Sequence, residues 1–161
     1  MKRQLLLTID GGNTNVVFGL FDGSDLLSQW RISTDVKRTA DEYGVWLTQL
    51  IALDGIEVID VSAAIVTTVV PQTMFPLTSL CERYFSCTPF TVENGDAVGI
   101  DVAVANPDEV GPDRLVNAVA AHAKYSGNSF GIPLEEKIKH YDDSVHLIKK
   151  AEELCPSLQT S

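Results

Sequence analysis

The sequence LLLTIDGGNTNVVFGLFD, residues 5–22, predicts the fold of this chain more directly than any other stretch. Its first apolar run, residues 5–9, is typical of a strand that is covered on both faces. A second run, residues 16–21, is rich in residues that favour strands. A short polar turn with two glycines separates the runs. The stretch therefore predicts two neighbouring strands joined by a tight turn.

This turn combines groups that suit a phosphate and its metal ion. Gly11 and Gly12 allow a ligand to approach the backbone closely, and Asp10 could reach a hydrated Mg²⁺ held by phosphates. The polar side chains that follow can donate hydrogen bonds beside backbone N–H groups. An ordinary hairpin with an Asx-type turn explains the same residues equally well, so the turn alone leaves both interpretations open. These polar side chains are Asn13, Thr14 and Asn15.

Two common nucleotide-binding motifs are excluded. The chain has no G-x-x-x-x-G-K-[ST] sequence, so it has no P-loop. The glycine spacing in the turn does not fit a Rossmann fingerprint, and a strand follows where that motif has a helix.

Length and composition bound the class of protein. A chain of 161 residues predicts one domain, with at most an appendage. Twelve basic against 22 acidic residues give a net charge of −10, which argues against binding nucleic acid or an anionic membrane. We find no signal peptide and no apolar run of transmembrane length, so we expect a soluble cytoplasmic protein. Cys81, Cys87 and Cys155 lack the spacing of metal ligands and are expected to be reduced thiols.

The rest of the pattern predicts alternating strands and helices. Thr39 and Glu42 form a capping box at the start of the first expected helix. The order is βββαβα, followed by further short strands and a last helix. This is the order of an actin-like, ribonuclease-H-type α/β half-domain with a mixed sheet and flanking helices. The expected strands are 5–10, 14–22, 26–32, 61–66, 90–92 and 101–104, and the expected helices are 39–53, 71–85 and 115–125.

A second group of chemically active residues lies in NPDEVGPDR, residues 106–114. Asp113 falls in the first turn of an expected helix, where the helix dipole favours a carboxylate. Arg114 can bind a carboxylate in bidentate geometry, and Gly111 and Pro112 shape the turn. A carboxylate base beside an arginine suits phosphoryl transfer to a hydroxyl on a carboxylate-bearing substrate. An ordinary helix cap with a salt-bridging arginine is the alternative.

Taken jointly, these motifs resemble the type III pantothenate kinases, also called the Bvg accessory factor family. The resemblance covers residues 1 to about 127, which we expect to form an N-terminal actin-like kinase half-domain. Val104 stands where many members have a substrate-contacting tyrosine, and Pro112 replaces the usual alanine. Gly11 replaces a more typical aliphatic residue. The motifs are DGGNTN at 10–15, WR at 30–31, RTADE at 38–42, VVP at 69–71, NP at 106–107 and GPDRLVNA at 111–118.

The resemblance implies ATP-dependent phosphorylation of pantothenate to 4′-phosphopantothenate, the first step of coenzyme A biosynthesis. Asp113 would be the general base, and the substrate would be held by Gly111, Pro112, Asp113 and Arg114. It also implies ATP with Mg²⁺, which Asp10 would approach through the phosphates, a monovalent cation (K⁺ or NH₄⁺), and a homodimer. The ATP-phosphate loop would consist of Asp10, Gly11, Gly12, Asn13, Thr14, Asn15, Val16 and Val17.

Residues 128–161 depart from the family pattern. They contain no second Asp-x-Gly-Thr phosphate loop. We therefore expect a truncated chain that is inactive alone and lacks the family's second domain and the ligands of the monovalent cation. An amphipathic helix is expected instead from Pro133 to about residue 155, either for docking or to cover a bare face. His140 and His146 are expected to be solvated.

Two other functions stay open at this point. One is a non-catalytic regulatory or accessory binding protein of the same fold, which the second family name suggests. The other is a fragment of an unrelated actin-like sugar or acetate kinase, against which the Gly-x-Asp-Arg segment at 111–114 argues.

Overall fold

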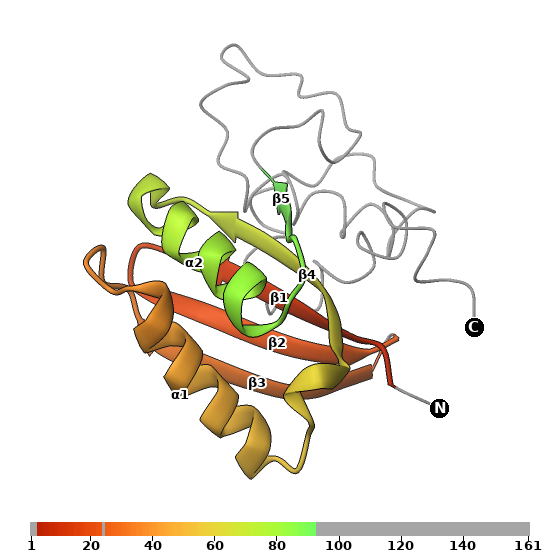
Figure 1. Cartoon of the computed structure of the whole chain (residues 1–161). Coiled ribbons are helices and arrows are strands. Elements are labelled where there is room, and N and C mark those ends of the chain that lie inside the picture. The colour runs from red at the N-terminus through yellow and green to blue at the C-terminus, as the bar shows by residue number, and fades with distance from the viewer. Residues whose placement is uncertain (1–2, 24, 93–161) are drawn as a thin grey trace, which may run out of the picture.

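The computed structural model describes residues 3–23 and 25–92, which form a five-stranded mixed sheet with two long helices packed on it (Figure 1). A 3₁₀ turn, η1 (Val58–Asp60), precedes the fourth strand. The helices are α1 (Ala40–Leu53) and α2 (Pro71–Tyr84). The strands are β1 (Leu5–Gly11), β2 (Asn15–Asp22), β3 (Asp25–Ser33), β4 (Val61–Thr68) and β5 (Phe90–Val92).

The strand order across the sheet is β3-β2-β1-β4-β5. β1, β2 and β3 form an antiparallel meander, whereas β4 pairs in parallel with both β1 and β5. The predicted α/β order is confirmed through residue 92. The strand expected at 101–104, the helix expected at 115–125 and the tail helix lie outside the described residues.

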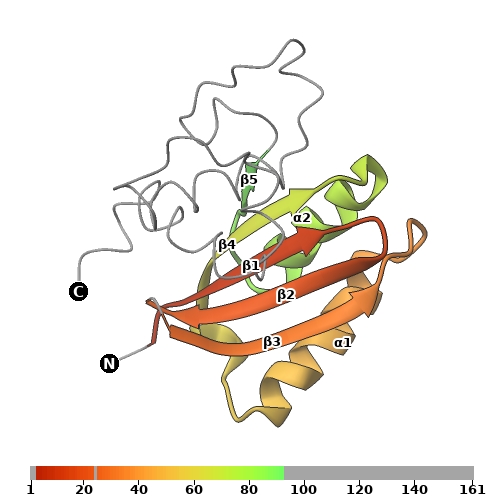
Figure 2. The same cartoon turned by 180° about the vertical axis from the view of Figure 1, so that it is seen from behind.

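Both helices lie on the same face of the sheet, as Figure 1 and the reverse view in Figure 2 show. Alternate residues of β1 and β2 enter the core beneath them, because successive strand side chains point to opposite faces. Each large apolar side chain in that layer stabilises the fold by roughly 1.5–3 kcal/mol. The sheet contributes Leu5, Leu7, Ile9, Val16, Phe18 and Leu20, and the helices contribute Tyr43, Leu47, Ile51, Leu77 and Leu80.

The opposite face of β1 is buried as well. Leu6 is 6% exposed and Thr8 is 1% exposed. The prediction that this strand is covered on both faces is therefore confirmed.

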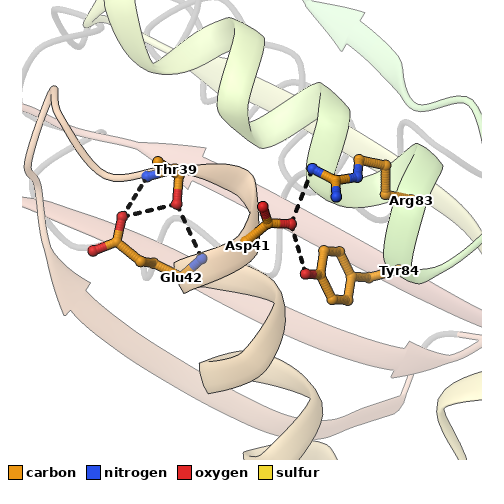
Figure 3. A network of polar contacts seen from close by, with 5 residues as sticks. All are labelled: Thr39, Asp41, Glu42, Arg83 and Tyr84. Carbon is orange, nitrogen blue, oxygen red and sulfur yellow. Dashed lines mark hydrogen bonds and ion pairs between the residues drawn. The ribbon is translucent and has the colours of Figure 1, made fainter.

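The predicted capping box begins α1 (Figure 3). The Glu42 amide donates to Thr39 Oγ1 at 3.3 Å, and the Thr39 amide donates to Glu42 Oε2 at 2.8 Å. Proline at the first position of α2 suits a helix start, because the missing N–H would have no partner there. Both helix starts follow directly from local sequence.

A polar cluster joins the start of α1 to the end of α2 (Figure 3). The Arg83 guanidinium lies 2.9 Å from Asp41 Oδ1, and the Tyr84 hydroxyl donates to the same oxygen at 2.7 Å. These contacts lower the pKa of the Asp41 carboxyl, with the Tyr84 hydrogen bond as the main cause. The cluster therefore links the two helices at the surface, above the buried core that holds them on the sheet.

Candidate phosphate-binding site

The turn at residues 11–15 lies at the end of the sheet where two parallel strands finish. Gly11 is opposite Thr68 in the register of β1 and β4, so the carboxyl ends of these strands meet at the turn. In open α/β sheets, ligands bind in the crevice outside such carboxyl ends. The turn therefore occupies the position at which the fold favours a ligand.

Protein donors hold three backbone carbonyls of the turn. The Gly11 carbonyl accepts from the Val69 amide at 3.0 Å and from Thr68 Oγ1 at 2.9 Å. The Gly12 carbonyl accepts from Thr34 Oγ1 at 2.6 Å, and the Thr14 carbonyl accepts from the Thr34 amide at 2.8 Å. These carbonyl oxygens are thus bonded within the fold.

The backbone N–H groups at the tip of the turn are arranged differently. The Gly12 amide closes the turn by donating to the Asn15 carbonyl at 2.9 Å. Within residues 3–23 and 25–92, the amides of Asn13 and Thr14 donate to no acceptor, and both residues are exposed. Neighbouring unpaired amides beside bonded carbonyls are the arrangement that binds anions. The turn is closed by backbone groups, as in an ordinary hairpin, and the two amides at its tip are left available to an anion.

Asp10 precedes the turn on the face of β1 that points away from the helices. It is half-buried and lies opposite Thr67 of β4 in the parallel register. The Thr67 hydroxyl is buried and has no hydrogen-bond partner in the described part of the chain. A carboxylate and a hydroxyl therefore stand on the same face of adjacent strands, beside the amides of the turn.

This arrangement suits a hydrated Mg²⁺ that arrives with a nucleotide. Magnesium is usually held by one or two carboxylates together with substrate phosphates and water. Asp10 provides one such carboxylate. Among the residues that the structure describes, no group of three or more His, Cys, Asp or Glu side chains could hold a metal ion without a substrate.

The structure brings the first set of predicted site residues together at one end of the sheet. Val16 is buried in the core and Val17 is half-buried on the Asp10 face, so both support the turn by packing. The strand bounds were off by one residue at each side of the turn, because Gly11 still pairs with its neighbours on both sides and β2 begins at Asn15. The second set, Gly111, Pro112, Asp113 and Arg114, lies outside the described residues.

Sequence reasoning missed Thr34 and Thr68, the two threonines that bond the turn. Thr34 is 22 residues from Gly12, and Thr68 is 57 residues from Gly11. Both follow motifs singled out in the sequence, WR at 30–31 and the buried strand at 61–66. Only the paired strands show that these segments meet at the turn.

No helix in the described part of the chain is long and apolar enough to cross a membrane.

Comparison of this chain with solved structures shows a likeness in fold. The chain resembles a reductive activator for a corrinoid, iron-sulfur protein with a TM-score of 0.52 and 15% identity. The match covers 80% of this chain and 27% of that one. At this identity the likeness supports the fold alone.

Sequence comparison gives a closer match. A sequence model described as type III pantothenate kinase matches residues 6–132. The type III pantothenate kinase of Paramagnetospirillum magneticum is 54% identical over 124 residues, which cover 76% of this chain and 48% of that protein. The one from Exiguobacterium sibiricum is 47% identical over 123 residues, which cover 76% of this chain and 49% of that protein. The chain spans about half the length of the curated relatives it matches.

The family match and the mixed sheet together confirm the predicted actin-like α/β class. The phosphate-type turn, the WR and RTADE segments and the VVP segment all fall within the matched region. This chain belongs to the type III pantothenate kinase family.

Proposed function

We propose that this chain supplies the ATP-phosphate-binding half of a pantothenate kinase. The reaction is transfer of the ATP γ-phosphoryl group to the hydroxyl of pantothenate, which gives 4′-phosphopantothenate for coenzyme A biosynthesis. The observation that carries the proposal is the turn between β1 and β2, where the amides of Asn13 and Thr14 are unpaired beside Asp10. Family membership supports the choice of substrate.

Residues 10–17 would bind the ATP phosphates. The unpaired amides would donate to phosphate oxygens, and Asp10 would hold water on the Mg²⁺ that neutralises their charge. Fixed donors aimed at developing charge supply most of the catalysis in phosphoryl transfer. The turn would therefore contribute to the rate as well as to binding.

The acceptor side of the reaction is assigned to residues 111–114. Asp113 would accept the proton of the pantothenate hydroxyl, and Arg114 would pair with the pantothenate carboxylate, with Gly111 and Pro112 shaping the contact. We further propose a monovalent cation, K⁺ or NH₄⁺, a homodimer and a cytoplasmic location. Residues 1–127 would form the kinase half-domain, and residues 128–161 would lie outside it.

A chimera tests this function. Residues 6–127 would replace the matching segment of the Paramagnetospirillum magneticum relative, and pantothenate-dependent ADP release would be measured beside the same assay on this chain alone. We expect an active chimera that Asp113→Asn slows by about 10²–10⁴-fold. Asp60→Asn, in the 3₁₀ turn at the far end of β4, is the matched control and should leave the rate unchanged. A folded chimera that makes no phosphopantothenate would refute the proposal.

A further inference from the structure

Thr34 contacts the turn through two different groups. Its hydroxyl donates to the Gly12 carbonyl at 2.6 Å, and its amide donates to the Thr14 carbonyl at 2.8 Å. A peptide group is planar and trans, so its C=O and the following N–H point in opposite directions. By holding the Gly12 carbonyl, the Thr34 hydroxyl therefore aims the Asn13 N–H in the opposite direction, away from Thr34. That N–H is one of the two unpaired amides.

Thr68 holds the other end of the turn. Its hydroxyl donates to the Gly11 carbonyl at 2.9 Å and accepts from the Val70 amide at 3.0 Å. The Thr73 hydroxyl lies 2.8 Å from it, and both side chains are buried. The Gly11 carbonyl is thereby fixed from β4, which aims the Gly12 N–H towards the Asn15 carbonyl that closes the turn.

We propose that Thr34 and Thr68 are positioning residues for phosphate binding. They hold the Gly11 and Gly12 carbonyls, so that the Gly12 amide closes the turn and the Asn13 amide is left available to an incoming phosphate. Without Thr34 the Gly12 carbonyl could rotate towards the phosphate, where its partial negative charge would repel the anion. Without Thr68 the Gly11 carbonyl would be held by the Val69 amide alone. The inference rests on the proposed function. It adds Thr34, which follows β3, and Thr68, the last residue of β4, as residues that act through the turn.

Backbone amide exchange in the whole chain tests the positioning without any ligand. Thr34→Val should speed exchange at the Gly12 and Thr34 amides, and Thr68→Val should speed it at Val69 and Val70. Thr34→Ser and Thr68→Ser keep the hydroxyl and should restore the slow exchange. Thr78→Val is the matched control, because it removes a hydroxyl that donates to the Phe75 carbonyl within α2, away from the turn. Thermal unfolding checks that each variant is folded.

Titration with MgATP and with inorganic tripolyphosphate then tests whether the two hydroxyls strengthen phosphate binding. We expect each valine variant to bind both ligands about threefold to tenfold more weakly, the effect of one hydrogen bond. The serine variants and Thr78→Val should bind as the unmodified chain does. Unchanged affinity in Thr34→Val and Thr68→Val overturns the proposal, even where their amide exchange is faster. An equal loss of affinity in the serine variants also overturns the proposal.

The two proposals can fail separately. If the unmodified chain binds neither ligand, phosphate binding by this chain is refuted. The exchange data alone then decide whether the two hydroxyls set the turn, since faster exchange in the valine variants supports this and unchanged exchange overturns it.

Discussion

Gly11 has no room for a side chain. A Cβ built there would lie 2.5 Å from Thr68 Oγ1 and 2.8 Å from Thr68 Cβ. Because both contacts are with a buried side chain, Gly11→Ala must push β1 and β4 apart. We expect it to lower the free energy of unfolding by about 1–3 kcal/mol, measured by urea denaturation.

A double-mutant cycle separates this contact from other effects. Thr68→Gly removes both of the atoms that crowd Gly11, and the next neighbour, Thr73 Oγ1, lies at an ordinary 3.4 Å. Gly11→Ala should therefore lower the free energy of unfolding much less in the Thr68→Gly background than in the unmodified chain. Equal costs in the two backgrounds would contradict the explanation.

Single residues show what the sequence could and could not predict about the site. Asp10 to Asn15 are consecutive, so their common chemistry was visible in the sequence. Thr34 and Thr68 act on the same turn from 22 and 57 residues away, and a threonine at or just past a strand end has no local signal of such a contact. Their role depends on strand register, which only the folded sheet defines.

At the scale of elements, Gly44 allows α1 to pack against α2. A Cβ at Gly44 would lie 2.5 Å from the Tyr84 ring, which is held by its hydrogen bond to Asp41. An alanine in a helix interior is normally more stable than a glycine by roughly 0.5–1 kcal/mol. Here we expect Gly44→Ala to destabilise the chain by about 1–2 kcal/mol, since the Tyr84 ring must move and lose its hydrogen bond to Asp41.

Removing the ring should reverse the sign of this effect. In a Tyr84→Ala background, Gly44→Ala should stabilise α1 by roughly 0.5–1 kcal/mol in chemical denaturation. A destabilisation that persists without the ring would show that the Tyr84 contact is not its cause.

The capping box of α1 predicts a dependence on pH. The Thr39 amide, and then its hydroxyl, lower the pKa of the Glu42 carboxyl below its usual 4.5. The charged form is therefore favoured by folding, so its stabilisation is complete above pH 4.5 and disappears as the pH falls through the lower folded value. Urea denaturation at pH 7 and pH 3 should show a smaller loss of stability in Glu42→Gln than in the unmodified chain.

Thr39→Ala provides the matching test of the cap itself. This substitution should lower the free energy of unfolding by about 0.5–2 kcal/mol at pH 7, and Thr39→Ser should recover most of that loss. Similar stability in the alanine and serine variants would mean that the cap contributes nothing.

Helix starts could be predicted from the sequence more reliably than strand ends. Thr39, Glu42 and Pro71 act within one turn of the chain, so their patterns suffice. Gly11 belongs to β1 only because Val16 and Thr68 pair with it from neighbouring strands. A glycine beside polar residues looks like a turn until these partners are known.

At the scale of the whole molecule, the order of elements was enough to predict the mixed sheet, because a helix between β3 and β4 permits the parallel pairing with β1. The relation between the turn and residues 111–114 could not be inferred in the same way. It depends on how segments outside the described residues pack, and their motifs say only which chemistry they would bring.

Cys81 reports on the unfolding of the whole sheet and its helices. Its side chain is fully buried in the core, and burial raises the pKa of its thiol, so little thiolate is available in the folded chain. We expect iodoacetamide to modify Cys81 at least about 10³-fold more slowly in the folded chain than in urea, because reaction requires opening of the core. Peptide mapping by mass spectrometry would follow the modification.

Cys87 provides the internal control for this measurement. It is half-buried and lies beyond the end of α2, so it should react faster than Cys81 although burial also raises its pKa. If the described residues unfold as one unit, Gly11→Ala should raise the Cys81 rate by the same factor as it raises the unfolding equilibrium constant. An unchanged Cys81 rate would show instead that α2 opens separately from the strands that carry the turn.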